Sequence, residues 1–209
     1  MKRTLAFTLF LAFAAITTYG QANLNFSVGI NYSDYRFENF QGLTLLPRWG
    51  HFFGIAPNYQ INQQLRVLVD LQYTVRGYDM SADGAPANTA TRYSYLDIIP
   101  EVEYNVLPFL ALGVGVNYGI KLQEAIKYPN QDWEDTKEFG LVSSTDFGLT
   151  GKVKVMDKNI FGFARYTYGV SNIADIMFTD DQGQDLGKAK QFTRNLQIGV
   201  GYTLNLRKN

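Results

Sequence analysis

The alternation of apolar and polar residues along the chain most constrains its fold, and it is clearest over residues 196–206. Every second residue there is apolar or aromatic, and those between are polar or glycine. A period of two predicts a β-strand with an apolar face and a polar face. The apolar face would suit contact with lipid, and the polar face would suit the inside of a narrow barrel. For this segment alone, a strand of a soluble sandwich remains an alternative.

Seven earlier segments repeat the pattern with varying regularity, which gives eight predicted strands. The predicted strands cover residues 24–33, 49–60, 65–76, 91–104, 109–122, 139–155, 160–170 and 196–206. Their connections alternate between long and short along the whole chain. Short periplasmic turns, longer extracellular loops and an even strand number are typical of outer-membrane barrels.

The pattern therefore predicts an all-β fold, an eight-stranded antiparallel transmembrane β-barrel with up-and-down connections. We expect the last strand to pair with the first, because open sheet edges are not tolerated in lipid. Pro57 and Pro100 lie within predicted strands and lack a backbone N–H, so we expect bulged or frayed pairing at both. Alternation alone does not distinguish this fold from a soluble barrel with an apolar interior.

The first twenty residues have the features of a secretory signal peptide. Lys2 and Arg3 precede an apolar run too short to span a bilayer comfortably, and small residues lie just before Gln21. We expect residues 1–20 to be removed and residues 21–209 to form the barrel domain, in the outer membrane with both termini periplasmic. The chain has no Cys, which excludes disulfides and a Cys-based metal site.

The predicted register directs a nearly balanced set of charges into the barrel. These residues are Arg66, Asp70, Arg76, Asp97, Glu101, Glu103, Lys121, Asp146, Lys152, Lys154 and Arg165. An eight-stranded barrel is just wide enough for side chains to fill it. We therefore expect a self-paired plug in preference to a charged conduit or an open pore.

Two further features belong to the membrane environment. Aromatic residues gather near strand ends, as interfacial girdles do. They are Tyr32, Trp49, Tyr78, Tyr118 and Tyr168 at one end, and Tyr59, Tyr104 and Tyr202 at the other. In the last strand, Gln197, Gly199, Tyr202 and Leu204 have the spacing of the C-terminal insertion signal of bacterial outer-membrane barrels.

Four groups of residues resemble a known family in their order and spacing. They are Asp70-Leu71-Gln72-Tyr73 with Gly77; residues 95–100; Arg165-Tyr166 with Gly169, Asn172 and Ile173; and Asn195 with Gln197, Gly199, Gly201 and Tyr202. Together they resemble the PorT-like small outer-membrane β-barrels of Bacteroidetes-type bacteria. The resemblance covers the mature chain and implies the barrel, but its residues build the wall and do not carry over the founding member's role in protein secretion.

The sequence favours a non-enzymatic barrel with a structural or interaction role, accessory to secretion as one option. Expected partners are outer-membrane lipid, the barrel-assembly machinery during insertion, and a protein bound through the extracellular loops. Equal numbers of basic and acidic residues give no indication of nucleic-acid binding, and we expect no cofactor or metal. A lipid-modifying enzyme and a narrow channel are the alternatives. For the enzyme, His51 is the only histidine and lacks a His-x-Ser pattern.

Overall fold

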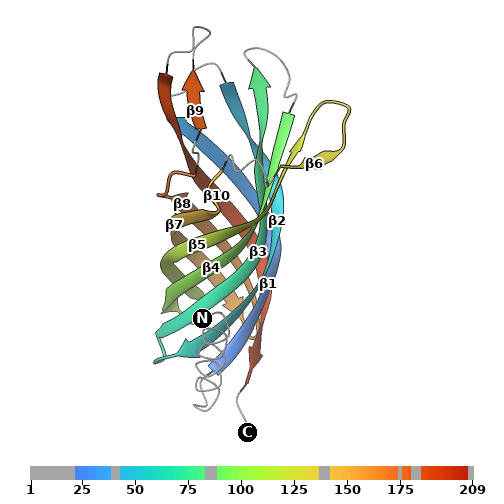
Figure 1. The fold of residues 1–209 in the computed structure, drawn as a ribbon. Helices are drawn as coiled ribbons and strands as arrows, with labels where there is room; N and C mark the ends of the chain where they lie inside the picture. The colour runs from blue at the N-terminus through green and yellow to red at the C-terminus, as the bar shows by residue number, and fades with distance from the viewer. Residues whose placement is uncertain are drawn as a thin grey trace, which may run out of the picture.

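The computed structural model describes residues 22–38, 43–82, 89–136, 142–173, 176–179 and 185–206, and they form a closed antiparallel β-barrel (Figure 1). The strands are β1 (Ala22–Glu38), β2 (Leu43–Gln60), β3 (Leu65–Ala82), β4 (Thr89–Leu107), β5 (Leu110–Lys127), β6 (Trp133–Asp135), β7 (Thr145–Asp157), β8 (Ile160–Gly169), β9 (Ile176–Thr179) and β10 (Asp185–Asn205). Among these described residues, no helix is long and apolar enough to cross a membrane.

Eight of the described strands form the ring, and each pairs with its neighbours in chain order. The short strands β6 and β9 lie outside it and pair with the ends of β5 and β10. The ring closes where β10 pairs with β1, in a continuous register from Asn23 opposite Asn205 to Glu38 opposite Lys190. The predicted eight-stranded up-and-down barrel and its closing pair are therefore confirmed.

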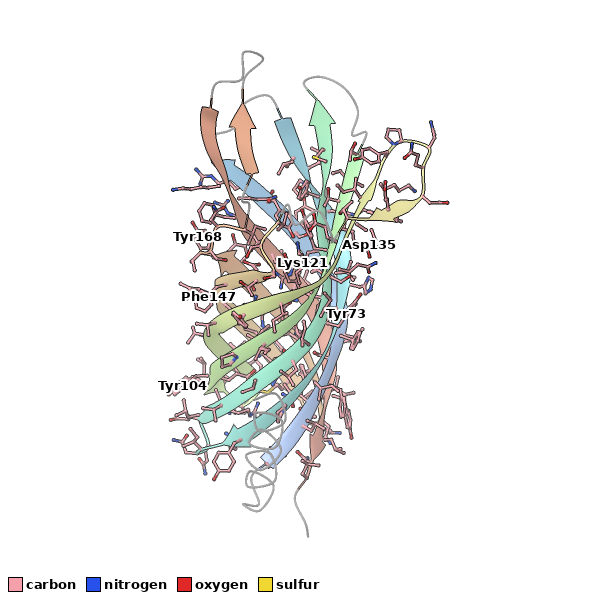
Figure 2. All side chains as sticks on the ribbon, in the orientation of Figure 1. Tyr73, Tyr104, Lys121, Asp135, Phe147 and Tyr168 are labelled. Atoms are coloured by element: carbon pink, nitrogen blue, oxygen red, sulfur yellow. The ribbon has the colours of Figure 1, made fainter. Side chains whose placement is uncertain are left out.

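The two faces of the wall follow the predicted alternation. On β1, Val28 and Ile30 are exposed on the outer surface, whereas Asn31 and Ser33 are buried inside. On β10, Val200 is exposed and Gln197 is buried. Figure 2 shows Tyr104, Phe147 and Tyr168 projecting outward from the wall at different heights. The outer face is thus an apolar surface suited to lipid, and the inner face carries the polar side chains.

The short connections lie at the same end of the barrel as the described ends of the chain. Residues 61–64 join β2 to β3, Pro108 and Phe109 join β4 to β5, and Lys158 and Asn159 join β7 to β8. Lys158 has a positive φ of 53°, which two-residue hairpin turns require. At the opposite end, Figure 1 shows strands continuing into long hairpins.

Several segments predicted as long loops are largely strand, which corrects the sequence reading. β1 continues to Glu38, β3 to Ala82 and β5 to Lys127, and β10 begins at Asp185, eleven residues before its predicted start. Part of the predicted sixth strand, residues 139–144, precedes β7, and residues 139–141 lie outside the described residues. Beyond the membrane the outer face of a hairpin contacts water instead of lipid, so the apolar alternation that marks a membrane strand is lost there.

The pairing is interrupted at both strand prolines, as expected from their missing N–H groups. The β2–β3 ladder lacks the pairs between Ile55 and Asn58, where Pro57 lies. The β4–β5 ladder lacks those between Ile98 and Glu101, where Pro100 lies. The register is the same on both sides of each gap, so the ladder is frayed without a bulge.

One outward prediction for β3 is wrong. Tyr78, predicted for the outer girdle, is buried and packs inside the barrel. It has the same parity as the inward Arg76, and β3 pairs with β4 in an unbroken register over both residues. Strict alternation therefore places Tyr78 inside, and only its aromatic character had suggested the girdle.

The closing pair of strands depends on close backbone contact at Gly29. A Cβ atom there would lie 2.2 Å from the carbonyl oxygen of Ile198 and 2.6 Å from Cα of Gly199. We predict that Gly29→Ala lowers the free energy of unfolding by about 1–3 kcal/mol, because neither backbone atom can move without distorting the seam. Urea titration of the refolded barrel, followed by its heat-modifiable gel mobility, measures this.

Gly151→Ala is the matched control, because a Cβ atom there meets nothing within 4 Å. It should leave the unfolding midpoint unchanged. Equal midpoints for the two variants would contradict the close approach of β1 and β10.

Candidate functional site

The barrel interior holds the charged residues selected from the sequence, and the first cluster surrounds Arg76. Its guanidinium forms ion pairs with Asp97 and, at 3.1 Å, with Asp146. Thr193 donates a hydrogen bond to Asp146 at 2.8 Å, and Asn117 donates one to Asp97 at 3.3 Å. These five residues come from β3, β4, β5, β7 and β10, so the cluster links strands around the ring.

A second cluster surrounds Arg165 on β8. Its Nη2 lies 2.8 Å from Asp70 Oδ2 and 3.1 Å from Glu101 Oε2. Its Nη1 donates a hydrogen bond to Gln197 at 3.3 Å, and Gln197 donates one to Gln72 at 3.1 Å. Arg165 is only 1% exposed, so its charge depends on these partners and not on water.

A third cluster surrounds Glu103, which accepts three cations. Lys152 lies 2.7 Å away, Lys154 3.3 Å and Arg66 3.1 Å. Lys152 also forms an ion pair with Glu101, which joins this cluster to that of Arg165. The clusters around Arg165 and Glu103 therefore form one connected network of alternating charges.

Glu124 is an interior carboxylate that the sequence reading missed. It is buried and lies 2.5 Å from Nζ of Lys121, which also donates a hydrogen bond to the carbonyl oxygen of Val142 at 2.7 Å. The β4–β5 register shifts between Ser94 and Tyr95, and this bulge turns Glu124 inward. The sequence had placed it in a loop, where a glutamate gives no signal of burial.

With Glu124 included, the described residues provide six interior cations and six interior carboxylates, and each of these has an ion-pair partner. All the inward charges predicted from the sequence lie in this set. Burying an unpaired charge is costly, and pairing with further hydrogen bonds offsets that cost. Beside Arg165 and Lys152 the interior leaves a cavity of about 10 Å³, close to the minimum that holds a single water molecule.

Aromatic side chains fill much of the remaining interior. Toward the extended hairpins, Tyr35, Tyr78, Tyr93 and Tyr95 form a buried cluster with Val142 and Ile173. Phe52, Phe161 and Phe163 pack among the charges, with Lys154 4.4 Å from the ring centroid of Phe161 and Arg165 5.4 Å from that of Phe163. Alternation placed Phe161 and Phe163 on the face of Arg165, but no sequence signal indicated that aromatic rings would fill so much of the interior.

The four residues of the proposed insertion signal divide between the two faces of β10. Gln197 joins the interior network, and Gly199 leaves space for the ring of Phe52. Tyr202 and Leu204 are exposed on the outer face, and Tyr202 accepts a hydrogen bond from Asn159 at 3.2 Å.

The outer face carries aromatic residues near both ends of its apolar band. Tyr32 and Trp49 are exposed and lie 4.9 Å apart between ring centroids. Tyr104 and Tyr202 are exposed at the end with the short turns. His51 points outward two residues after Trp49, in the same apolar surface. In the part of the chain that the structure describes, no group of three or more His, Cys, Asp or Glu side chains could hold a metal ion.

Comparisons with known proteins agree with this closed, lipid-facing barrel. Residues 14–175 match the model of the outer membrane protein beta-barrel domain. The chain belongs to this family. A comparison with curated protein sequences found no significant match.

Solved structures of small barrels share the fold. Ail, the attachment invasion locus protein of Yersinia pestis, solved in complex with the heparin analogue sucrose octasulfate, has a TM-score of 0.51 at 16% identity, over 88% of this chain and 99% of Ail. OprG of Pseudomonas aeruginosa has a TM-score of 0.51 at 14% identity, over 89% of this chain and 97% of OprG. Neisserial surface protein A has a TM-score of 0.51 at 15% identity, over 86% of this chain and 96% of that protein. The chain is thus an integral outer-membrane barrel protein whose apolar band contacts membrane lipid.

We predict that Arg76→Gln strongly destabilises this outer-membrane barrel, by about 3–5 kcal/mol, because it leaves Asp97 and Asp146 buried without a cation. Adding Asp97→Asn and Asp146→Asn to that variant should recover part of the loss. The unfolding midpoint in urea measures both effects.

Arg48→Gln is the matched control. Arg48 pairs with Asp79 at 2.8 Å, but both side chains are about one third exposed, 31% and 34%. Its loss should cost less than about 1 kcal/mol. A cost for Arg76→Gln no larger than that of the control would show that the interior charges do not depend on pairing.

Proposed function

We propose that the chain is a closed, non-enzymatic outer-membrane barrel that acts through protein contacts made by its extended hairpins. The single observation behind this proposal is the filled interior, where paired charges and aromatic rings occupy the space a solute would need. A barrel without a conduit influences its surroundings through its outer surface and its ends.

The hairpin that follows β5 is a suitable contact surface. β6 pairs with β5 over residues 125–127, and two guanidinium groups lie close to the ring of Trp133. Arg92 lies 4.5 Å and Arg48 5.0 Å from its centroid, which fixes the base of the hairpin against β2 and β4. Tyr128 and Glu134 are exposed on either side of Trp133 along the hairpin, and Figure 2 shows the hairpin of Asp135 leaning away from the barrel axis. A rigid, exposed hairpin supports recognition by another protein.

The proposal includes the orientation and maturation expected from the sequence. Residues 1–20 act as a signal peptide, and residues 21–209 are inserted by the barrel-assembly machinery through Gln197, Gly199, Tyr202 and Leu204. Both termini are then periplasmic, which places the extended hairpins outside the cell. The position of the described chain ends beside the short turns supports this orientation, since short turns are periplasmic in such barrels.

A PorT-like accessory role in protein secretion is the more specific form of the proposal. It rests on the four groups of residues that resemble that family, all of which lie in the barrel wall. Those residues support a common scaffold, so the hairpins must carry any contact with secretion components.

The proposal predicts a protein adduct from the β6 hairpin in living cells. A photo-crosslinking amino acid at Glu134 should give a discrete, larger band, whose partner mass spectrometry identifies. Val114, which is 67% exposed on the lipid-facing surface, should give no protein adduct and is the matched control. A secretion component in the adduct would support the accessory role. Absence of any adduct from Glu134 at native expression would contradict an interaction through this hairpin.

A further inference from the structure

A small cleft lies on the outer wall where β1, β10 and β8 meet, and it has a volume of about 190 Å³. Two arginines and two aromatic residues contribute to its lining: Arg36, Arg194, Tyr168 and Phe192. In the paired register, Arg36 lies opposite Phe192 and Arg194 lies opposite Tyr168. Neighbouring strands thus bring both guanidinium groups to one place, although 158 residues separate them along the chain.

The cleft faces the membrane side of the wall, not the lumen. Arg194 has the same parity on β10 as the exposed Leu196 and Ile198, and the intervening Asn195 is buried inside. Figure 2 shows Tyr168 projecting from the outside of the barrel. The two arginines are therefore directed toward whatever surrounds the barrel at this height.

That height is the edge of the apolar band at the end opposite the short turns. From Leu196 to Leu204 the outward residues of β10 are all apolar or aromatic. From Arg194 toward the hairpin they are Arg194, Phe192 and the exposed Lys190. The change from apolar to basic within one outward step marks the level of lipid headgroups, where long cationic side chains extend from apolar surface into polar surroundings.

The electrostatic state of these arginines differs from that of the interior cations. Every interior cation has a carboxylate partner, whereas no ion pair involves Arg36 or Arg194 among the described residues. Arg194 lies 5.7 Å above the ring of Tyr168, which holds its guanidinium beside the cleft. Asp34 is opposite Arg194 in the register, so one nearby carboxylate offsets part of the charge. Two guanidinium groups and one carboxylate leave a net positive site.

We propose that this cleft binds the phosphorylated headgroup of a lipid in the adjoining leaflet. Guanidinium groups form bidentate, charge-assisted hydrogen bonds with phosphate, and two of them on neighbouring strands can hold one phosphate group together. Phe192, Tyr168 and Val170 supply apolar contact beside it, continuous with the lipid-facing band. A lipid fits both parts, whereas a soluble phosphate would use only the charged one. With the orientation given under the proposed function, on which this identity rests, the lipid is the phosphorylated glycolipid of the outer leaflet.

The test uses the full barrel in phosphatidylcholine nanodiscs, with lipid A as the probe and native mass spectrometry to count bound molecules. Arg36→Gln with Arg194→Gln should weaken lipid A binding at least about tenfold. Arg92→Gln, whose guanidinium lies on Trp133, is the matched control and should leave binding unchanged. Arg36→Lys with Arg194→Lys should bind more tightly than the double glutamine variant and less tightly than the wild type. Lysine keeps the positive charge but lacks the planar guanidinium that forms two parallel hydrogen bonds with phosphate. Heat-modifiable mobility verifies that each variant is folded.

Two further probes identify the chemistry. Dephosphorylated lipid A should bind like the weakened variant, and inorganic phosphate alone should not compete at millimolar concentration. Equal binding of both lipids, or unchanged binding in the double glutamine variant, would overturn the site. Competition by inorganic phosphate would show that the cleft binds free phosphate and would overturn the proposal that its ligand is a lipid. Labelling of a single cysteine in the β6 hairpin on intact cells tests the orientation separately, so loss of lipid binding and a wrong orientation are distinguishable.

Discussion

The structure depends on one constraint, the closure of the backbone ladder between β1 and β10. In hydrocarbon an unpaired N–H or C=O group costs several kcal/mol, so a sheet that crosses a membrane must have no open edge. The pairing of Gly29 with Gly199 lets the two strands come close enough to close the ring. Closure then fixes the inside and outside of every other strand, because side chains alternate across a continuous wall.

Closure also determines which charges meet. The strands of a barrel are tilted, so residues far apart in sequence lie at the same height inside it. Arg165 meets Asp70 across 95 residues and Arg76 meets Asp146 across 70. Because each interior cation has a carboxylate within ion-pair distance, the interior is filled by its own side chains. In the part of the chain that the structure describes, Arg36 and Arg194 have no such partner where the outer face leaves the apolar band.

The sequence predicted the membrane-spanning part of the fold well, because lipid on one side and a narrow interior on the other impose a period of two on residues such as those from Leu196 to Leu204. It did not predict the extension of β1 to Glu38, since both faces of that hairpin are outside the lipid. Inward charges such as Arg165 followed from parity, but their partners depend on the tilt of the closed ring. Tyr78 was misplaced because its aromatic character was followed instead of its parity with Arg76. Glu124 was misplaced because the register shift between β4 and β5 changes parity along β5, and no single residue signals such a shift.

The central claim is that paired side chains close the interior of this outer-membrane barrel. Single-channel recording in a planar lipid bilayer tests it most directly, with insertion verified by protease accessibility of the exposed hairpins. A closed interior predicts no stepwise conductance from the wild-type barrel in molar KCl. Reproducible, uniform conductance steps from the wild-type protein would contradict it.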